Sequence, residues 1–305
     1  MASRRIAVTG ASGFIGRHLA AHLAARGDDV VPVRRPFERE TLAAVLGGVE
    51  TVVHLAGVVS AVRERDYFSA NADGTRAIAE AACAAGARLI YISSLAVAGP
   101  ASPSAPHAED DPPAPINAYG RSKLAGERAV AATADLRWTI LRPGVVYGPS
   151  DRALLPVFKM ARFRVLPAVG RATAAYTFVH VADLVRAIAA AVDRGRHGDT
   201  LFVGHPKPVY TRDLVRQIGA SAGHAVRVVP IPMAVTRAAA FAGDLLGAIR
   251  GKPSVINSRR YAELASVGFV CKVDRLRDRL GIVAEIDLDR GLRETAAWYQ
   301  REGWI

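Results

Sequence analysis

The first half of the chain alternates short apolar, strand-forming runs with alanine-rich stretches of helical period. The runs that predict strands cover residues 4–10, 29–35, 50–57, 87–95 and 136–148. The stretches that predict helices cover residues 14–27, 39–48, 71–86 and 122–134. This alternation predicts an α/β chain with a Rossmann-type, doubly wound parallel sheet, which binds ligands beyond the carboxyl ends of its strands.

The connection after the second predicted strand is short. Residues 35–50 leave room for one helix, but hardly for an additional edge strand with a second helix. We therefore expect a reduced or missing edge strand on that side of the sheet.

The second half of the chain is less regular. A strand and helix are expected over 177–195, a strand over 199–204, and further elements follow. We predict a nucleotide-binding Rossmann domain made of residues 1–150 and 176–204. A smaller, mainly C-terminal α/β substrate-binding domain would comprise residues 151–175 and 205–305.

The proline-rich, acidic stretch at 100–115 is predicted to be a surface loop. It precedes Tyr119 closely, so it is either a flap beside an active site or a plain connector.

Composition narrows the range of functions. The chain has 305 residues, 50% of them hydrophobic, and two cysteines without a CxxC pair. We expect no disulfide framework, no metal site, no secretory signal and a cytoplasmic location. The net charge is +12, but no basic run exceeds Arg-Arg and basic residues do not interleave with aromatic ones. We interpret the charge as a solvated basic surface and expect no nucleic-acid partner.

One helix-forming stretch, residues 232–251, comes closest to the length and hydropathy of a membrane span. It carries Arg237, Asp244 and Arg250, so we predict a buried or pocket-lining helix. A peripheral membrane contact is the less favoured alternative.

A glycine triad connects the first strand to the first helix, where the chain reads TGASGFIG. Gly10 can make the tight turn, Gly13 lets the backbone approach a pyrophosphate, and Gly16 allows close packing of helix and sheet. Phe14 and Ile15 open the helix, whose N-terminal N–H groups attract an anion. The triad predicts a dinucleotide-binding site.

The end of the second strand bears on the type of dinucleotide. An acidic residue there favours NAD, whereas an arginine favours the 2′-phosphate of NADP. Here the strand ends at Arg34 and Arg35 without an acid. We predict a preference for NADP, and Glu38 and Glu40 keep NAD open.

Tyr119 and Lys123 lie four residues apart at the start of a predicted helix, on one face. This spacing suits a proton-transfer pair, but also an ordinary amphipathic helix.

Six motifs in order resemble the extended short-chain dehydrogenase/reductase superfamily, the NAD(P)-dependent epimerase/dehydratase group. They are TGASGFIG (9–16), VVHLAG (52–57), NADGTR (71–76), YISSLAVAG (91–99) with YGRSK (119–123), LRPGVVYGP (141–149) and FVHVADL (178–184). The resemblance is weak in the last third of the chain.

The resemblance implies that Tyr119 is the general acid/base. Lys123 would hold the nicotinamide ribose and lower the pKa of the tyrosine. Ser94 would hydrogen-bond the substrate oxygen. The other residues that the resemblance assigns to the cofactor are Leu55, Ala56, Gly57, Asn71, Pro143, Val145 and Val146.

Other polar residues receive structural interpretations. His54 and His180 are expected to be satisfied structural histidines, and Asp183 a helix cap.

The departures from the family pattern concern the substrate. Tyr176 stands where many nucleotide-sugar members have an arginine, and Ala98 where many have a tyrosine. Both changes remove a polar contact and favour an uncharged, more hydrophobic small-molecule ketone or alcohol, hence a reductase or dehydrogenase. A nucleotide-sugar epimerase or dehydratase, with Arg164 or Arg171 contacting the diphosphate, is the alternative. A catalytically idle scaffold is the third hypothesis, and a homodimer is compatible with all three.

Overall fold

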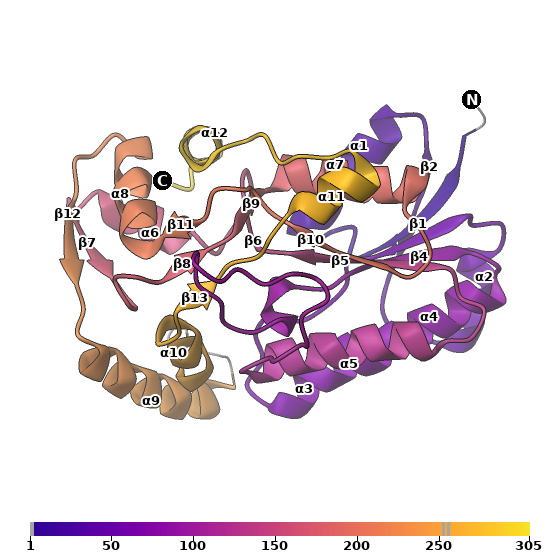
Figure 1. The fold of residues 1–305 in the computed structure, drawn as a ribbon, viewed down its shortest axis with the longest axis horizontal. Coiled ribbons are helices and arrows are strands. Elements are labelled where there is room, and N and C mark those ends of the chain that lie inside the picture. Colours follow the sequence, from indigo (N-terminus) through magenta and orange to yellow (C-terminus); the bar gives the residue numbers. More distant parts are fainter. Residues whose placement is uncertain (1–2, 252–253, 255–256) are drawn as a thin grey trace.

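The computed structural model, which describes residues 3–251, 254 and 257–305, is built on a six-stranded parallel sheet (Figure 1). The strand order is β10-β5-β4-β3-β1-β2. These strands are β1 (Arg5–Thr9), β2 (Asp29–Val33), β3 (Thr51–His54), β4 (Arg88–Ile92), β5 (Trp138–Pro143) and β10 (Asp199–Val203). All five pairings are parallel, which confirms the predicted Rossmann-type class.

Two layers of helices cover the sheet. One face carries α1 (Phe14–Ala25), α7 (Val181–Arg194) and α11 (Asp274–Leu280), and the other carries α2 (Arg39–Leu46), α4 (Gly74–Ala84) and α5 (Ala118–Ala132). Within the described residues no strand pairs with the outer side of β2, so the expected missing edge strand is confirmed.

The predicted helix at 71–86 begins earlier than expected and is not regular. It starts as α3 (Glu64–Phe68), continues through a π-helical turn at Ser69–Asp73, and becomes α4. Asn71 lies on the π turn and is completely buried.

A second, smaller set of elements follows β5. Two short strands, β6 (Val145–Tyr147) and β9 (Phe178–His180), pair in parallel. Beyond them lie the pair β7 (Val165–Ala168) with β12 (Arg227–Pro230), and the trio β11 (Val209–Tyr210), β8 (Ala175–Tyr176) and β13 (Gly268–Phe269). Their helices are α6 (Leu155–Ala161), α8 (Thr211–Ser221), α9 (Met233–Arg250), α10 (Ser258–Leu264) and α12 (Leu288–Arg301).

The division into two domains remains a prediction, but one segment packs differently from its assignment. Leu276, Leu280 and Ala284, in and just after α11, belong to the same buried cluster as the sheet and α7. The side chain of Asp183 holds the continuation of this segment. It accepts hydrogen bonds from the N–H groups of Glu285 (3.0 Å) and Ile286 (2.9 Å).

Asp183 is therefore not the helix cap that we expected. His180 occupies the N-cap of α7, where its Nδ1 accepts from the N–H of Ala182 at 3.4 Å. The His180 side chain is buried, which agrees with a structural role, but its Nε2 has no hydrogen-bond partner among the described residues, so His180 is not the fully satisfied histidine that we expected.

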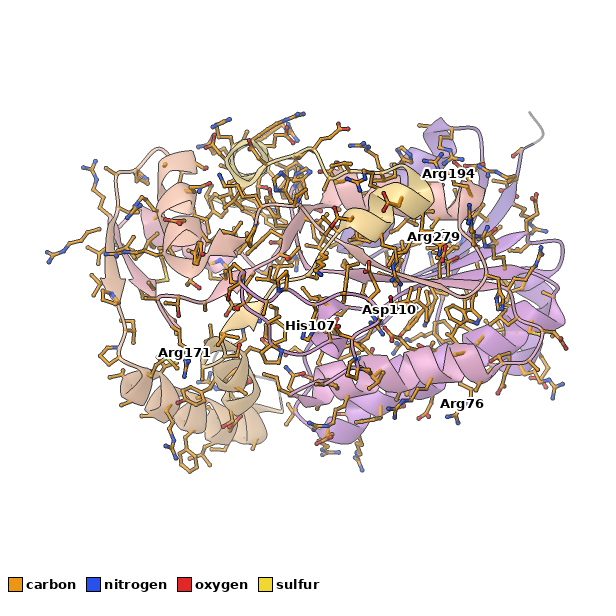
Figure 2. The ribbon with its side chains drawn as sticks, in the orientation of Figure 1. Arg76, His107, Asp110, Arg171, Arg194 and Arg279 are labelled. Carbon is orange, nitrogen blue, oxygen red and sulfur yellow. The ribbon has the colours of Figure 1, made fainter. Side chains whose placement is uncertain are left out.

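The loop at 100–115 docks on the strand β13 and the residues after it. The N–H of Ala101 donates to the carbonyl of Gly268 (3.0 Å), and that of His107 to the carbonyl of Val270 (3.0 Å). Asp110, which Figure 2 labels with His107, pairs with Arg275. Two adjoining cavities lie beside Tyr119 and Ser94, at the carboxyl ends of the strands. Among the described residues, none from 100–115 lines either cavity, so a connector describes this loop better than a flap.

The prediction for residues 232–251 is wrong in one respect. They form α9, but its large apolar side chains are exposed rather than buried. Among the described residues, no helix combines the length and the apolar character needed to cross a membrane.

Candidate active site

The turn between β1 and α1 has the geometry of a phosphate-binding loop. Gly10 adopts φ +69°, a conformation that disfavours side chains. A Cβ on Gly16 would lie 2.1 Å from the carbonyl oxygen of Gly10, so only glycine allows helix and turn to approach this closely. Gly13, the N-cap, has no side chain to bond the first N–H groups of α1, which leaves them for an anion.

A cavity of about 660 Å³ opens from this turn along the carboxyl ends of the strands. Its lining includes most of the residues predicted to bind the cofactor. They are Gly10, Gly13, Phe14, Ile15, Gly16, Leu55, Gly57, Asn71, Tyr119, Lys123, Pro143 and Val146.

Four predicted cofactor residues lie outside this lining. Ala56 acts through its backbone, which donates to the Thr9 hydroxyl at 3.0 Å. Val145 lines the neighbouring cavity instead. Arg34 and Arg35 are exposed just beyond the end of β2, and Arg35 donates to the carbonyl of Ala70 at 3.4 Å.

Sequence reasoning missed six polar residues at this cavity: Ser12, Arg17, Ser93, Ser150, Asp151 and Arg152. The Ser93 hydroxyl is buried and has no hydrogen-bond partner among the described residues. A buried hydroxyl without a partner is costly, so it is suited to receive a ligand group. With the glycine cradle and the free helix terminus, this fits a dinucleotide at the carboxyl edge of the sheet.

A buried hydrogen-bond chain shapes the floor of the cavity. The Thr9 hydroxyl contacts His54 Nδ1 at 2.7 Å, and His54 Nε2 contacts the Thr75 hydroxyl at 3.1 Å. Thr75 in turn donates to the carbonyl of Asn71 at 2.7 Å. Burial, followed by the charges of Lys123 and Arg35, lowers the pKa of His54 to about 3. His54 is therefore a neutral structural residue, as the sequence predicted.

Asn71 holds the loop after β3 at the cavity wall. Its Oδ1 accepts from the N–H of Val58 at 2.7 Å, and its Nδ2 donates to the Val58 carbonyl at 2.9 Å. The same Nδ2 contacts the hydroxyl of Ser122 on α5 at 2.9 Å. Asn71, which we expected at the cofactor, therefore also clamps Val58 through two hydrogen bonds.

Tyr119 and Ser94 come together from two elements. Asn117 caps α5 by accepting from the N–H of Gly120 at 2.8 Å, and this places Tyr119 in the first turn. Ser94 follows β4, and its hydroxyl is close enough to the phenol of Tyr119 to affect the pKa of that phenol. Burial raises the pKa of Tyr119, and the Ser94 hydroxyl acts in the opposite direction.

Lys123 lies one turn further along α5 and is buried. Its ammonium donates to the carbonyl of Ile92 at 2.7 Å and stands 4.3 Å from the centre of the Tyr91 ring. Burial lowers the pKa of Lys123 to about 7, and the charge of Glu127 opposes that shift. Glu127 is itself held by Arg142 of β5 through two hydrogen bonds, at 2.9 and 2.6 Å.

A second cavity, of about 290 Å³, adjoins the first. Ser94 and Tyr119 line both cavities, as do Pro143 and Gly144. Apolar side chains dominate the remaining wall: Leu95, Ala96, Val145, Leu154, Phe178, Leu214, Leu264 and Phe269. This arrangement places the Ser94–Tyr119 pair where two ligands would meet.

The polar groups of the second cavity were mostly not foreseen. The hydroxyls of Tyr176 and Thr211 are buried there without a hydrogen-bond partner among the described residues. Arg260 and Glu263 of α10 also line it, and they pair with each other at 3.0 Å. No sequence signal identified α10, because it comes to the cavity only through the tertiary fold.

The basic residues proposed for a diphosphate lie elsewhere. Two other basic residues of this region, Lys159 and Arg162, line a separate cavity beside Trp304. Arg171, labelled in Figure 2 beside α10, donates its backbone N–H to the carbonyl of Leu264 at 3.3 Å. Neither Arg164 nor Arg171 is among the described residues that line the second cavity.

Comparison with known proteins agrees with this geometry. The chain matches the NAD dependent epimerase/dehydratase family over residues 6–204. It is 31% identical over 321 residues to the ceramide reductase of Caulobacter vibrioides (strain NA1000 / CB15N), covering 98% of this chain and 96% of that protein. It is 28% identical over 271 residues to the 4-hydroxy-2-methyl-3-oxo-4-farnesyl-3,4-dihydroquinoline-1-oxide ketoreductase of Stigmatella aurantiaca, covering 79% and 80%.

A solved structure shares the whole architecture. MoeE5 in complex with UDP-glucuronic acid and NAD superimposes with a TM-score of 0.78 at 26% identity, covering 98% of this chain and 99% of that one. The phosphate loop, the Ser94–Tyr119 pair and these likenesses lead to one conclusion. The chain is an NAD(P)-binding enzyme that belongs to the NAD dependent epimerase/dehydratase family.

Proposed function

We propose that the protein is an NADP(H)-preferring reductase or dehydrogenase that interconverts a ketone and a secondary alcohol in a mainly apolar small molecule. The observation that carries this proposal is the position of Ser94 and Tyr119, which line both the dinucleotide cavity and the apolar cavity beside it.

The proposed chemistry needs one group from the cofactor and three from the chain. Bound NADPH would supply the hydride for the carbonyl carbon of the substrate. The carbonyl oxygen would then gain negative charge and need a proton, which the phenol of Tyr119 is placed to donate. The hydroxyl of Ser94, which lines both cavities with that phenol, would donate a hydrogen bond to the same oxygen.

Lys123 would support this proton transfer by its charge. A buried tyrosine with a raised pKa is a poor base for the reverse reaction, so a nearby cation is needed to stabilise the phenolate. Lys123 lines the dinucleotide cavity with Tyr119, where it would also hold the nicotinamide ribose.

The second cavity supports a hydrophobic substrate that carries a polar group. Its wall is mainly apolar, and Tyr176 stands in place of the arginine common in nucleotide-sugar relatives. The unpartnered hydroxyls of Tyr176 and Thr211 would be satisfied by a hydroxyl or amide of the substrate. The names of two relatives, a ceramide reductase and the ketoreductase of a farnesylated quinoline, are consistent with this class.

The preference for NADP rests on the end of β2. That strand ends at Val33, and the exposed Arg34 and Arg35 follow it where an acid would select NAD. Guanidinium groups match the geometry of a phosphate, so these arginines would hold the 2′-phosphate.

Turnover of a substrate panel tests the activity. The wild type should consume NADPH with a long-chain keto amide or a sterol ketone, and should leave UDP-glucose and UDP-glucuronic acid unchanged. Conversion of a UDP-sugar without net loss of NADPH would instead establish the epimerase alternative.

Tyr119→Phe isolates the proton donor. We expect it to lower kcat by about 10²–10⁴-fold, the usual contribution of general acid catalysis, while the Kd for NADPH stays within about twofold. Full activity in this variant would remove the assigned role, and an inactive wild type that still binds NADPH would favour the scaffold hypothesis.

The cofactor preference is tested separately by titration. The double variant Arg34→Ala/Arg35→Ala should bind NADPH at least about tenfold more weakly, because it loses charge-assisted hydrogen bonds, and should bind NADH nearly as before. Equal losses for the two cofactors would contradict the preference.

A further inference from the structure

Helix α9 buries its small side chains and exposes its large apolar ones, whereas an ordinary amphipathic helix buries the large apolar ones. Its buried positions, spaced by three or four residues, hold only small side chains: Thr236, Ala240, Gly243 and Gly247. Its exposed positions hold the large apolar ones: Val235, Phe241, Leu245, Leu246 and Ile249. Phe241 is 75% exposed and Ile249 is 74% exposed. A helix that buries its small residues and exposes its large ones marks an interaction surface.

The charges on α9 complete this surface. Its one acidic residue, Asp244, is engaged by the backbone, since it accepts from the N–H of Ser258 at 3.2 Å. Arg237 and Arg250 are exposed towards the two ends of the helix. The outward surface therefore combines apolar side chains with basic ones.

The position of α9 relates this surface to the second cavity. The start of α10 is tied to α9 through Asp244, and α10 contributes Arg260, Glu263 and Leu264 to the cavity wall. Figure 1 shows α9 at the periphery of the molecule, with α10 between it and β13. A partner bound to the exposed side of α9 would therefore lie on the side of the molecule where α10 borders the second cavity.

We propose that α9 docks the protein on a lipid bilayer with anionic headgroups. The helix would lie in the plane of the bilayer, with Phe241, Leu245 and Ile249 among the acyl chains and Arg237 and Arg250 at the lipid phosphates. Its 18 residues give an in-plane contact about 27 Å long. The net charge of +12 favours the approach to such a surface.

Charge argues for a bilayer over a second copy of this chain. A two-fold pairing of exposed α9 faces brings Arg237 of one copy near Arg250 of the other if the helices are antiparallel, and near Arg237 of the other if they are parallel. Like charges at the edge of an apolar contact are unfavourable, whereas anionic headgroups neutralise both arginines. The proposal does not depend on the identity of the substrate.

Sedimentation of the full chain with vesicles tests the proposal. Vesicles made of equal parts phosphatidylcholine and phosphatidylglycerol should carry the wild type down, and vesicles of phosphatidylcholine alone should carry less. Phe241→Ser/Ile249→Ser should lower the partition coefficient at least about tenfold, because it removes two apolar anchors. Arg237→Gln/Arg250→Gln should weaken binding to the anionic vesicles only.

A matched control separates this surface from general hydrophobicity. Phe163 is 63% exposed but lies outside α9, so Phe163→Ser should bind vesicles as the wild type does. All variants should keep the Kd for NADPH, which shows that they fold. Failure of the wild type to bind, or unchanged binding by the double serine variant, would overturn the proposal. A dimer of the wild type that the double serine variant dissociates would overturn it too, in favour of an interface between copies.

Discussion

Replacing Lys123 with methionine tests whether burial changes the charge of this lysine in the folded protein. Its side chain is 4% exposed, and burial lowers its pKa from 10.5 to about 7. Below about pH 7 the lysine is charged in both the folded and the unfolded chain, so the full cost of burying the charge is present. Between about pH 7 and 10.5 the unfolded chain binds a proton that the folded chain has released, so the free energy of unfolding rises with pH.

The magnitude follows from the two pKa values. At about 1.36 kcal/mol per pKa unit, the stability contributed by this site should rise by about 2 kcal/mol between pH 7 and pH 9. Methionine does not titrate, so the free energy of unfolding of Lys123→Met lacks this pH-dependent contribution. The difference in free energy of unfolding between the wild type and the variant should therefore change by about 2 kcal/mol in favour of the wild type between pH 7 and pH 9.

Urea unfolding of the cofactor-free protein at several pH values measures this difference. Lys159→Met, which removes an exposed lysine on α6, is the matched control for the loss of a lysine side chain. A difference between wild type and Lys123→Met that stays constant from about pH 7 to 9 would refute the reasoning, since Lys123 would then keep its charge in the folded state.

Three further predictions concern the parts that hold the site together. Glu127→Ala should lower the free energy of unfolding by about 3–5 kcal/mol, because it leaves Arg142 charged, buried and unpaired, and replacing both by apolar residues should recover most of the loss in urea melts. Gly16→Ala should weaken NADPH binding at least about tenfold in calorimetric titrations, since its Cβ would collide with the carbonyl of Gly10; an unchanged Kd would contradict the phosphate-loop assignment. Asp183→Ala should accelerate hydrogen exchange at the N–H groups of Glu285 and Ile286, and slow exchange there would show that other contacts hold this segment.

The regular part of the fold was predictable because its signals are local. Each strand is a short apolar run and each helix a longer one of helical period, so the alternation specified a parallel sheet. The glycine triad was predicted for the same reason, since it lies between a strand end and a helix start that the pattern located. The roles of Ser94, Tyr119 and Lys123 were predicted from the resemblance to the family, because their spacing alone left an ordinary helix open. The structure brings them together at one edge of the sheet.

The substrate cavity and α9 were not predictable from local pattern. Arg260 and Glu263 lie at the cavity because residues far away in the sequence contact α10, such as Asn117, whose side-chain amide donates to Glu263 at 2.7 Å. For α9, hydropathy showed that the helix is apolar but not which face its neighbours would cover. The small residues Gly243 and Gly247 indicate the packed face only in hindsight, because glycine permits close approach.

The π-helical turn that carries Asn71 imposes a constraint on insertions and deletions. A π-helical turn holds one residue more than an α-helical turn, so removing one residue from Ser69–Asp73 would close the bulge that carries Asn71. Tyr67, whose ring lies 6.4 Å from that of Tyr119, directly precedes this turn and would be displaced with it. The clamp of Asn71 on Val58 would be lost in the same step. Chains of this type that keep both features should therefore tolerate substitutions in this turn much better than a change in its length.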